Sequence, residues 1–199
     1  MTIRRSKLPA SLYKLGRFTF KQAKEAGLSQ SAVVRLVSAG VVEKISRGIY
    51  EVIERGLDPA TRDFAVACIS LGEESVIGGL TALFHYGLAE EVPAKLWVLV
   101  PPTTYRPSNR HYRLVRTKMD LTVGVERHAD YRITSLERTI VDTFVFSSKL
   151  GEKLAYRAAM RAIREKRTTP DKLFKMAHRL GVPERLAAHA QALFGGLEA

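Results

Sequence analysis

The segment from Thr19 to Val52 constrains what this chain can fold into more than any other part of the sequence. Thr19 fits a helix N-cap, and Gly27 stands where a glycine C-cap would end the helix that follows. Ser29 fits the N-cap of a second helix, whose buried face is marked at the i, i+3, i+4 and i+7 spacing by Val33, Leu36, Val37 and Gly40. Two helices joined by so tight a turn predict a helix-turn-helix.

The second of these helices leaves a set of small polar, apolar and arginine side chains at its N-terminus and on its outward side: Gln30, Ser31, Val34, Arg35 and Ser38. In a helix-turn-helix protein this helix enters the major groove of DNA, where short side chains allow close approach. We therefore expect these residues to contact DNA. An ordinary αα-hairpin without a ligand is the alternative interpretation of the same spacing.

A β-hairpin is expected directly after the second helix. Two β-prone runs between Val41 and Val52 flank Ser46-Arg47-Gly48, where Gly48 can supply the positive φ of a hairpin turn. Such a hairpin is the wing of a winged helix. Arg47 at its tip is expected to contact phosphate or the minor groove, and Lys44 the DNA backbone. Tyr50 is expected to pack back against the helices.

The net charge of +12 is spread unevenly along the chain. Residues 1–57 hold eleven Lys and Arg against four Glu, residues 58–148 hold ten basic against eleven acidic side chains, and residues 149–172 hold eight against three. Two basic zones around a neutral centre produce a field that attracts a polyanion such as DNA. A solvated basic surface without a partner is the alternative.

The order of several segments points to a known family. The helix-turn-helix and the wing are followed by three further stretches: Ser75–Leu88, Leu96–Pro101 and Ser135–Asp142. In this order the chain resembles the AbiEi antitoxins of type IV toxin–antitoxin systems, which are also transcriptional regulators. The resemblance covers about residues 8–145. One departure is Tyr86, which separates His85 from Gly87 where the family has an Ala-Leu-x-x-His-Gly-Leu kind of pattern.

The resemblance implies two activities. An N-terminal winged helix would bind inverted repeats in double-stranded DNA and repress the chain's own operon, and a C-terminal domain would counteract a nucleotidyltransferase-like toxin. Because such antitoxins are thought not to require a stable complex with the toxin, direct binding of the toxin is left open. A winged-helix transcription factor with an unrelated sensor or partner-binding body is the main alternative, and an enzyme or RNA-binding protein with a basic head is the third.

The remainder of the chain, residues 58–199, is expected to form an α/β antitoxin domain. Helices are expected over 62–71 and 76–88, β-prone runs over 96–100, 112–116, 123–127 and 130–133, and closing helices over 136–146, 149–166, 170–180 and 183–194. The predicted fold class is therefore α+β, a winged helix-turn-helix followed by a small-sheet α/β domain with a helical C-terminal segment.

Two parts of this domain carry basic side chains that could form a second polyanion or toxin contact. Arg106 and Arg110 lie in a Pro-rich exposed loop, which is otherwise a simple connection. The helix over 149–166 carries, at helical spacing on one side, Lys153, Arg157, Arg161 and Arg164. A solvated helix face is the alternative for this second set.

No pattern of catalysis or metal binding stands out. The five histidines have no metal-ligand spacing, no phosphate-binding glycine loop is present, and Gly78-Gly79 is better interpreted as close helix packing. Asp142 lies one helical turn after Arg138 and fits an ion pair on the side of a helix. The single cysteine, Cys68, fits a core position. We expect no enzymatic activity, cofactor, metal or membrane span, and a cytoplasmic protein.

Overall fold

The computed structural model describes residues 8–108, 110–189 and 193, and the chain divides into two compact units, Met1–Ser70 and Leu71–Ala199. The sequence predicts that the winged-helix domain, called the head below, covers residues 1–57. The N-terminal unit of the structure also includes η3 (Pro59–Thr61) and most of α4 (Arg62–Leu71). The reason is a set of contacts back to the strands. The Arg62 guanidinium lies 2.6 Å from a Glu51 carboxylate oxygen, and the Arg17 Nη2 donates to the Asp58 carbonyl at 3.0 Å.

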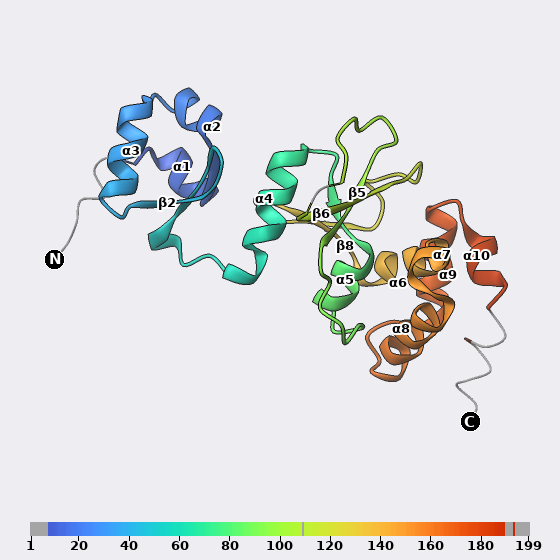
Figure 1. Ribbon diagram of the computed structural model, residues 1–199. Coiled ribbons are helices and arrows are strands. Elements are labelled where there is room, and N and C mark those ends of the chain that lie inside the picture. Colours follow the sequence, from blue (N-terminus) through green and yellow to red (C-terminus); the bar gives the residue numbers. More distant parts are fainter. Residues whose placement is uncertain (1–7, 109, 190–192, 194–199) are drawn as a thin grey trace. The chain divides into compact units, whose positions relative to one another are not determined.

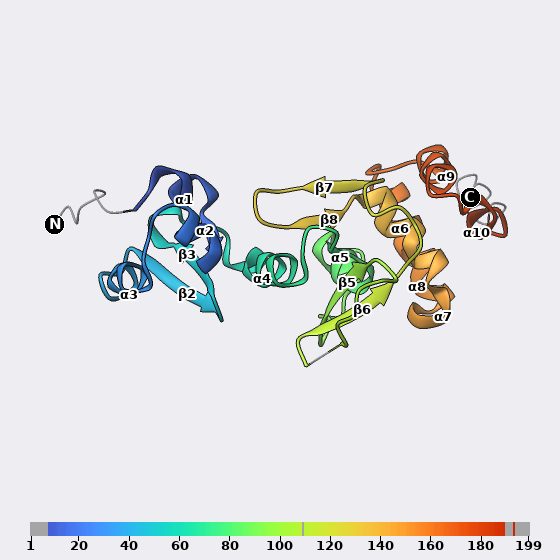
Figure 2. The ribbon, with the colours of Figure 1, turned by 90° about the horizontal axis from the view of Figure 1, so that it is seen from above.

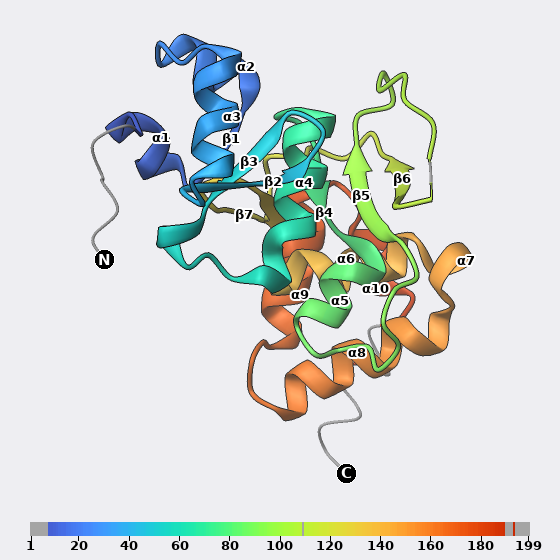
Figure 3. The same ribbon diagram turned by 60° about the vertical axis from the view of Figure 1, so that its left-hand side comes forward.

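The N-terminal unit alternates short helices and strands in the order α1 (Ala10–Leu15), β1 (Arg17–Thr19), α2 (Phe20–Glu25), α3 (Gln30–Ser38), β2 (Val42–Ser46), β3 (Ile49–Val52) and η2 (Ile53–Arg55). Its three strands form an antiparallel sheet in the order β1-β3-β2. Figure 3 shows α2 and α3 followed by the β2–β3 hairpin. The sequence does not predict β1, because its three residues lead directly into α2 without turn residues between them.

One apolar core holds this unit together. It contains Leu12 from α1, Phe18 from β1, Val33 from α3 and Val52 from β3, each at most 1% exposed. Thr19 caps α2 as expected. Its hydroxyl accepts from the Gln22 backbone N–H at 3.2 Å, and the Gln22 side chain accepts from the Thr19 N–H at 2.7 Å, which is a capping box.

The second unit, Leu71–Ala199, is called the body below. It is built on a five-stranded mixed sheet in the order β6-β5-β4-β8-β7 (Figure 1). The strands are β4 (Val76–Ile77), β5 (Leu96–Val100), β6 (Tyr112–Arg116), β7 (Val125–Arg127) and β8 (Arg132–Thr134). The helices are α5 (Gly79–His85), α6 (Leu136–Val145), α7 (Ser147–Leu150), α8 (Glu152–Arg164), α9 (Pro170–Arg179) and α10 (Pro183–Ala187). In Figure 2, α5 and α6 lie next to the sheet, and α8, α9 and α10 lie beyond α6.

Two of the predicted body helices are corrected by the structure. The segment 76–88 is not one helix, because Val76 and Ile77 form the central strand β4 between β5 and β8. Gly78 and Gly79 then start α5 against β5, where an added Cβ would come within 2.8 Å of Leu99 or 2.7 Å of Trp97. These glycines do mark close packing, but against a strand.

The predicted helix over 149–166 is divided at Gly151, whose φ of 87° ends α7 and precedes α8. The expected last helix, 183–194, is seen as α10 up to Ala187, and residues 190–192 and 194 lie outside the described part of the chain. None of the helices within the described ranges combines the length and apolar character that a membrane span requires.

Candidate nucleic-acid interface

The helix α3 is built so that one face packs and the other is open. Its N-cap is Ser29, whose hydroxyl accepts from the Ala32 N–H at 3.2 Å and lies 3.0 Å from the Ser31 hydroxyl. Val33 and Leu36 are buried in the core of the N-terminal unit. The structure places all five predicted contact residues of this helix on the exposed side: Gln30, Ser31, Val34, Arg35 and Ser38.

Arg35 is not paired with Glu25 or Glu43, the two nearby acidic residues that could form an ion pair with it. Glu25 lies 3.9 Å from Lys21, and Glu43 lies 3.1 Å from Arg62. Arg35 forms no ion pair among the described residues. Its guanidinium is therefore available to a ligand, and arginine is the side chain that most often reads guanine, because it can bond to two acceptors at once.

The hairpin after α3 turns where expected, and its turn is two residues long. Ser46 pairs with Ile49 across it, and the turn consists of Arg47 and Gly48, with Gly48 at a φ of 73°. Arg47 and Lys44 are exposed. Tyr50 packs back into the unit as expected, because its ring stacks on Phe18 with centroids 5.7 Å apart.

A buried ion-pair network lies behind the wing and was not predicted. Arg17 and Glu51 face each other across β1 and β3, and the Arg17 Nε lies 2.7 Å from the Glu51 carboxylate. Burial raises the pKa of Glu51, but hydrogen bonds and charges from Arg62 and Arg17 hold this pKa below its ordinary value of 4.5. Arg17 is only 3% exposed. It adds to the basic count of the head but is not available to bind a phosphate.

The two arginines of the Pro-rich loop are exposed, but the loop itself is anchored to the sheet. The Arg116 guanidinium donates to the Arg106 carbonyl at 2.7 Å and to the Thr104 carbonyl at 3.2 Å. Arg110 bonds to the neighbouring His111 at 2.9 Å. Figure 3 shows this β5–β6 connection extending from the two strands. A role of Arg106 and Arg110 in polyanion binding stays a prediction.

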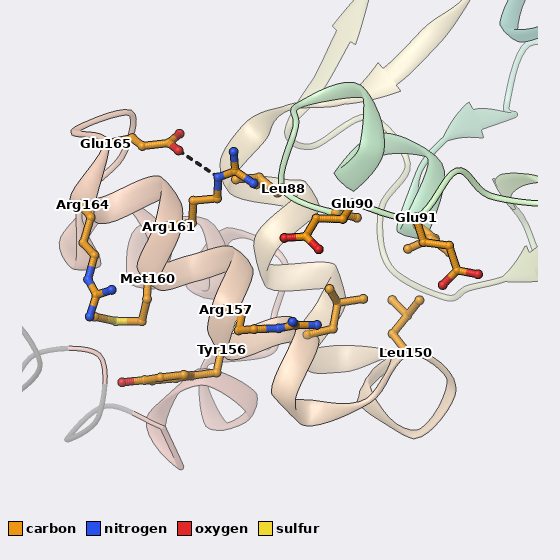
Figure 4. A pocket seen from close by; sticks show the side chains of 13 residues that line it. Leu88, Glu90, Glu91, Leu150, Tyr156, Arg157, Met160, Arg161, Arg164 and Glu165 are labelled. Atoms are coloured by element: carbon orange, nitrogen blue, oxygen red, sulfur yellow. Dashed lines mark hydrogen bonds and ion pairs between the residues drawn. The ribbon is translucent and has the colours of Figure 1, made fainter.

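The basic residues of α8 are also exposed, and three of them line an open groove of about 770 Å³. Its lining combines apolar side chains, among them Leu88, Leu154 and Met160, with charged ones. The charged residues are Arg157, Arg161, Arg164, Glu90, Glu91 and Glu165. Figure 4 shows Arg157 reaching from α8 toward the segment that carries Glu90 and Glu91. Arg161 is paired with Glu165 at 2.8 Å. The groove is therefore balanced in charge, with three arginines and three glutamates along it.

The ion pair predicted at Arg138 and Asp142 exists, but it lies in the interior and not on an exposed helix side. Both side chains are fully buried, with 3.2 Å between the Arg138 Nε and the Asp142 Oδ2. Burial raises the pKa of Asp142 to about 6, against the lowering effect of the Arg138 charge. Arg138 also donates to the Asp120 carbonyl at 2.7 Å. The pair holds the loop before β7 to α6 and has no opening to a substrate.

Among the described residues no cluster of three or more His, Cys, Asp or Glu could hold a metal ion. Cys68 is buried, as expected for a core residue. Tyr86, the departure from the family pattern, is the C-cap of α5, and its hydroxyl donates to the Thr134 carbonyl at 2.9 Å. The extra residue thus fastens the end of α5 to β8.

The element order of the N-terminal unit and the open face of α3 define a winged helix-turn-helix protein with a mixed α/β body and a helical C-terminal segment. Residues 11–53 match a family model described as "Transcriptional regulator, AbiEi antitoxin". The resemblance inferred from the sequence is thereby confirmed for this region, and the description of the family names a regulator and antitoxin.

The structure is also similar to the crystal structure of the RV2827C protein from Mycobacterium tuberculosis, with a TM-score of 0.52 and 15% sequence identity. The likeness covers 96% of this chain and 80% of that one. At this identity it shows a shared fold that includes the body. No curated protein matches the sequence significantly.

Proposed function

We propose that this chain is a DNA-binding repressor of its own operon and an antitoxin that counteracts a nucleotidyltransferase-like toxin. One observation carries the DNA-binding part. The exposed face of α3, with Arg35 unpaired among the described residues, stands beside a wing tipped by Arg47, inside the region that matches a regulator family.

The two elements have different tasks in this proposal. The α3 face enters the major groove, where Gln30, Ser31 and Arg35 meet base edges, because only side chains in the groove can read sequence. Lys44 and Arg47 hold the phosphate backbone or lie in the minor groove. The operator consists of inverted repeats in double-stranded DNA, each read by one copy of the N-terminal unit.

The body carries the antitoxin activity. It is a compact unit with its own sheet and helical core, so it can act separately from the unit that binds DNA. A stable complex with the toxin is not part of the proposal.

A footprint on the promoter DNA directly upstream of the chain's own gene tests the repressor role. The full-length protein should protect a sequence that contains an inverted repeat, and protection should weaken steeply as salt rises. The double variant Arg35→Ala, Arg47→Ala should lose protection, whereas the matched control Lys172→Ala, Lys175→Ala, which removes two exposed charges from α9, should keep it. Absence of protection by the wild-type protein at low salt would overturn the proposal.

A regulator whose body binds an unrelated partner is the second candidate, and the groove beside α8 is the site at which such a partner would bind. Co-expression of the full chain with the neighbouring nucleotidyltransferase-like gene separates the two. Restored growth supports the antitoxin role. Unrelieved toxicity, with DNA binding intact, supports the second candidate.

A further inference from the structure

We propose that Val34 reads the C5-methyl group of a thymine, and so determines sequence preference together with Arg35. The proposal rests on the DNA-binding function proposed above, and it names a chemical group that this function alone does not specify.

Val34 occupies the middle of the exposed face of α3. Gln30 and Ser38 lie four residues before and after it, and Ser31 lies three residues before it, so all three neighbour it on the helix surface. Val33 and Leu36 point into the core, and Val37 is packed against that core. Val34 is 56% exposed and is not among the described residues that form or pack against the core of the N-terminal unit. An apolar side chain is thus surrounded by polar ones.

A single exposed apolar residue needs no explanation by itself. The position of Val34 is what carries the inference, because the face around it is the one that a helix-turn-helix protein inserts into the major groove. Valine cannot form a hydrogen bond, and it is a weaker helix former than alanine. The base edges of the major groove offer one apolar group, the methyl of thymine. Contact between Val34 and that methyl group would therefore bury apolar surface of both.

Deoxyuridine provides the probe, because it keeps every hydrogen-bonding group of thymine and lacks only the methyl. Preferred duplexes are first selected from a random library with the full-length protein, and each thymine is then replaced singly. At one or two positions the wild-type protein should bind about fourfold more weakly, which corresponds to burying one methyl-sized group. At those positions Val34→Ala should bind thymine and uracil duplexes equally.

Two controls define the result. Val92→Ala removes an exposed valine of the body, 69% exposed, and should keep the full preference for thymine. Circular dichroism should show that Val34→Ala is folded, as expected for an exposed helix position.

The outcomes are distinguishable. Specific binding that no uracil substitution weakens, or a thymine preference that persists in Val34→Ala, overturns the proposal for Val34 and leaves the repressor role intact. Uniform weakening of all duplexes by Val34→Ala, without loss of the thymine preference, assigns Val34 to a protein contact and also overturns it. Absence of any salt-dependent duplex binding by the wild-type protein removes the proposed function itself.

Discussion

Arg35 and Arg47 carry the same charge, but Arg35 lies on a helix face and Arg47 at a hairpin tip. Replacing each of them should therefore change DNA binding in a different way. Arg35→Ala should reduce the free-energy difference between specific and random-DNA binding by about 1–3 kcal/mol, because a base contact is lost. Arg47→Ala should keep that difference and reduce the slope of log affinity against log salt by about 0.9, the share of one phosphate contact. Titrations of both variants on preferred and scrambled duplexes at several salt concentrations measure both quantities. Equal losses on both duplexes for both variants would contradict these roles.

Glu51 is the shared acceptor of the ion-pair network behind the wing, so replacing it should destabilise the N-terminal unit. Glu51→Gln leaves Arg17 buried without a counter-charge, which costs about 3 kcal/mol at neutral pH. Because the folded-state pKa of Glu51 is lowered, its contribution is present above the ordinary value of 4.5 and is lost as pH falls through the lowered pKa. Hydrogen exchange of the β1–β3 amides at neutral and acidic pH measures the effect. A gap between wild type and variant that stays constant down to the lowest pH would contradict it.

Asp142 should show the opposite pH dependence. Its folded-state pKa is raised from 3.8 to about 6, so its stabilising contribution is complete below 3.8 and is lost as pH rises through 6. The unfolding free energy of the body should therefore fall as pH rises through this range. Asp142→Asn should lack this pH dependence. The chain's one tryptophan, Trp97 in β5, reports the body during urea unfolding. Identical pH profiles for wild type and variant would disprove the assignment.

The exposure of the candidate contact residues on α3 could be predicted from the sequence. A helical period of 3.6 residues is enough to separate the buried Val33 and Leu36 from the exposed Val34 and Arg35. The buried pairs could not be predicted in this way. Arg17 and Glu51 are 34 residues apart and meet through the register of β1 and β3. For Arg138 the spacing to Asp142 was visible, but its complete burial depends on how the segment before β7 folds over α6.

Among the elements, those with a strong local signal were predicted, and the strands β1 and β4 were not. The capped helices α2 and α3 and the Arg47-Gly48 turn carry such signals. The strand β4 is two residues long, and Val76-Ile77 before two glycines fits a helix start as well as a strand. Its identity is decided by pairing with β5 and β8, which a local pattern does not contain.

The contacts of η3 and the start of α4 lead to a prediction about fragments. A fragment of residues 1–57 lacks Arg62 and the Asp58 carbonyl, which bond to Glu51 and Arg17. We expect residues 1–70 to unfold at a clearly higher temperature than 1–57, because the shorter fragment leaves a buried pair half satisfied. Thermal unfolding by circular dichroism compares the two, and salt-dependent duplex binding should follow the folded fragment. Equal melting temperatures would show that the network adds no stability to the head.

At the scale of the whole molecule, the sequence predicted a head and a body, and the structure moves the boundary between them to Ser70. The body's charge could not be judged from a count along the chain. The arginines of α8 share their groove with Glu90 and Glu91, which lie more than sixty residues earlier and reach it only through folding.

Separate compact units predict separable activities. Residues 71–199, co-expressed with the presumed toxin, should restore growth without binding promoter DNA. Full-length protein that carries both Arg35→Ala and Arg47→Ala should give the same result. Growth curves and a promoter reporter in the same strain measure both activities. Unrelieved arrest with the fragment, shown to be folded by its Trp97 fluorescence, would contradict the division, and so would repression by the fragment.

The network around Glu51 also bears on how relatives of this chain can diverge. One carboxylate serves Arg17 across the sheet and Arg62 on α4. A lineage that loses the glutamate leaves Arg17 buried without a counter-charge, whereas Arg62 keeps Glu43 as a partner. Apolar side chains of similar volume would fill the Arg17 site at little cost. Positions 17 and 51 should therefore change together or not at all, and an aligned set of relatives should show them as a correlated pair.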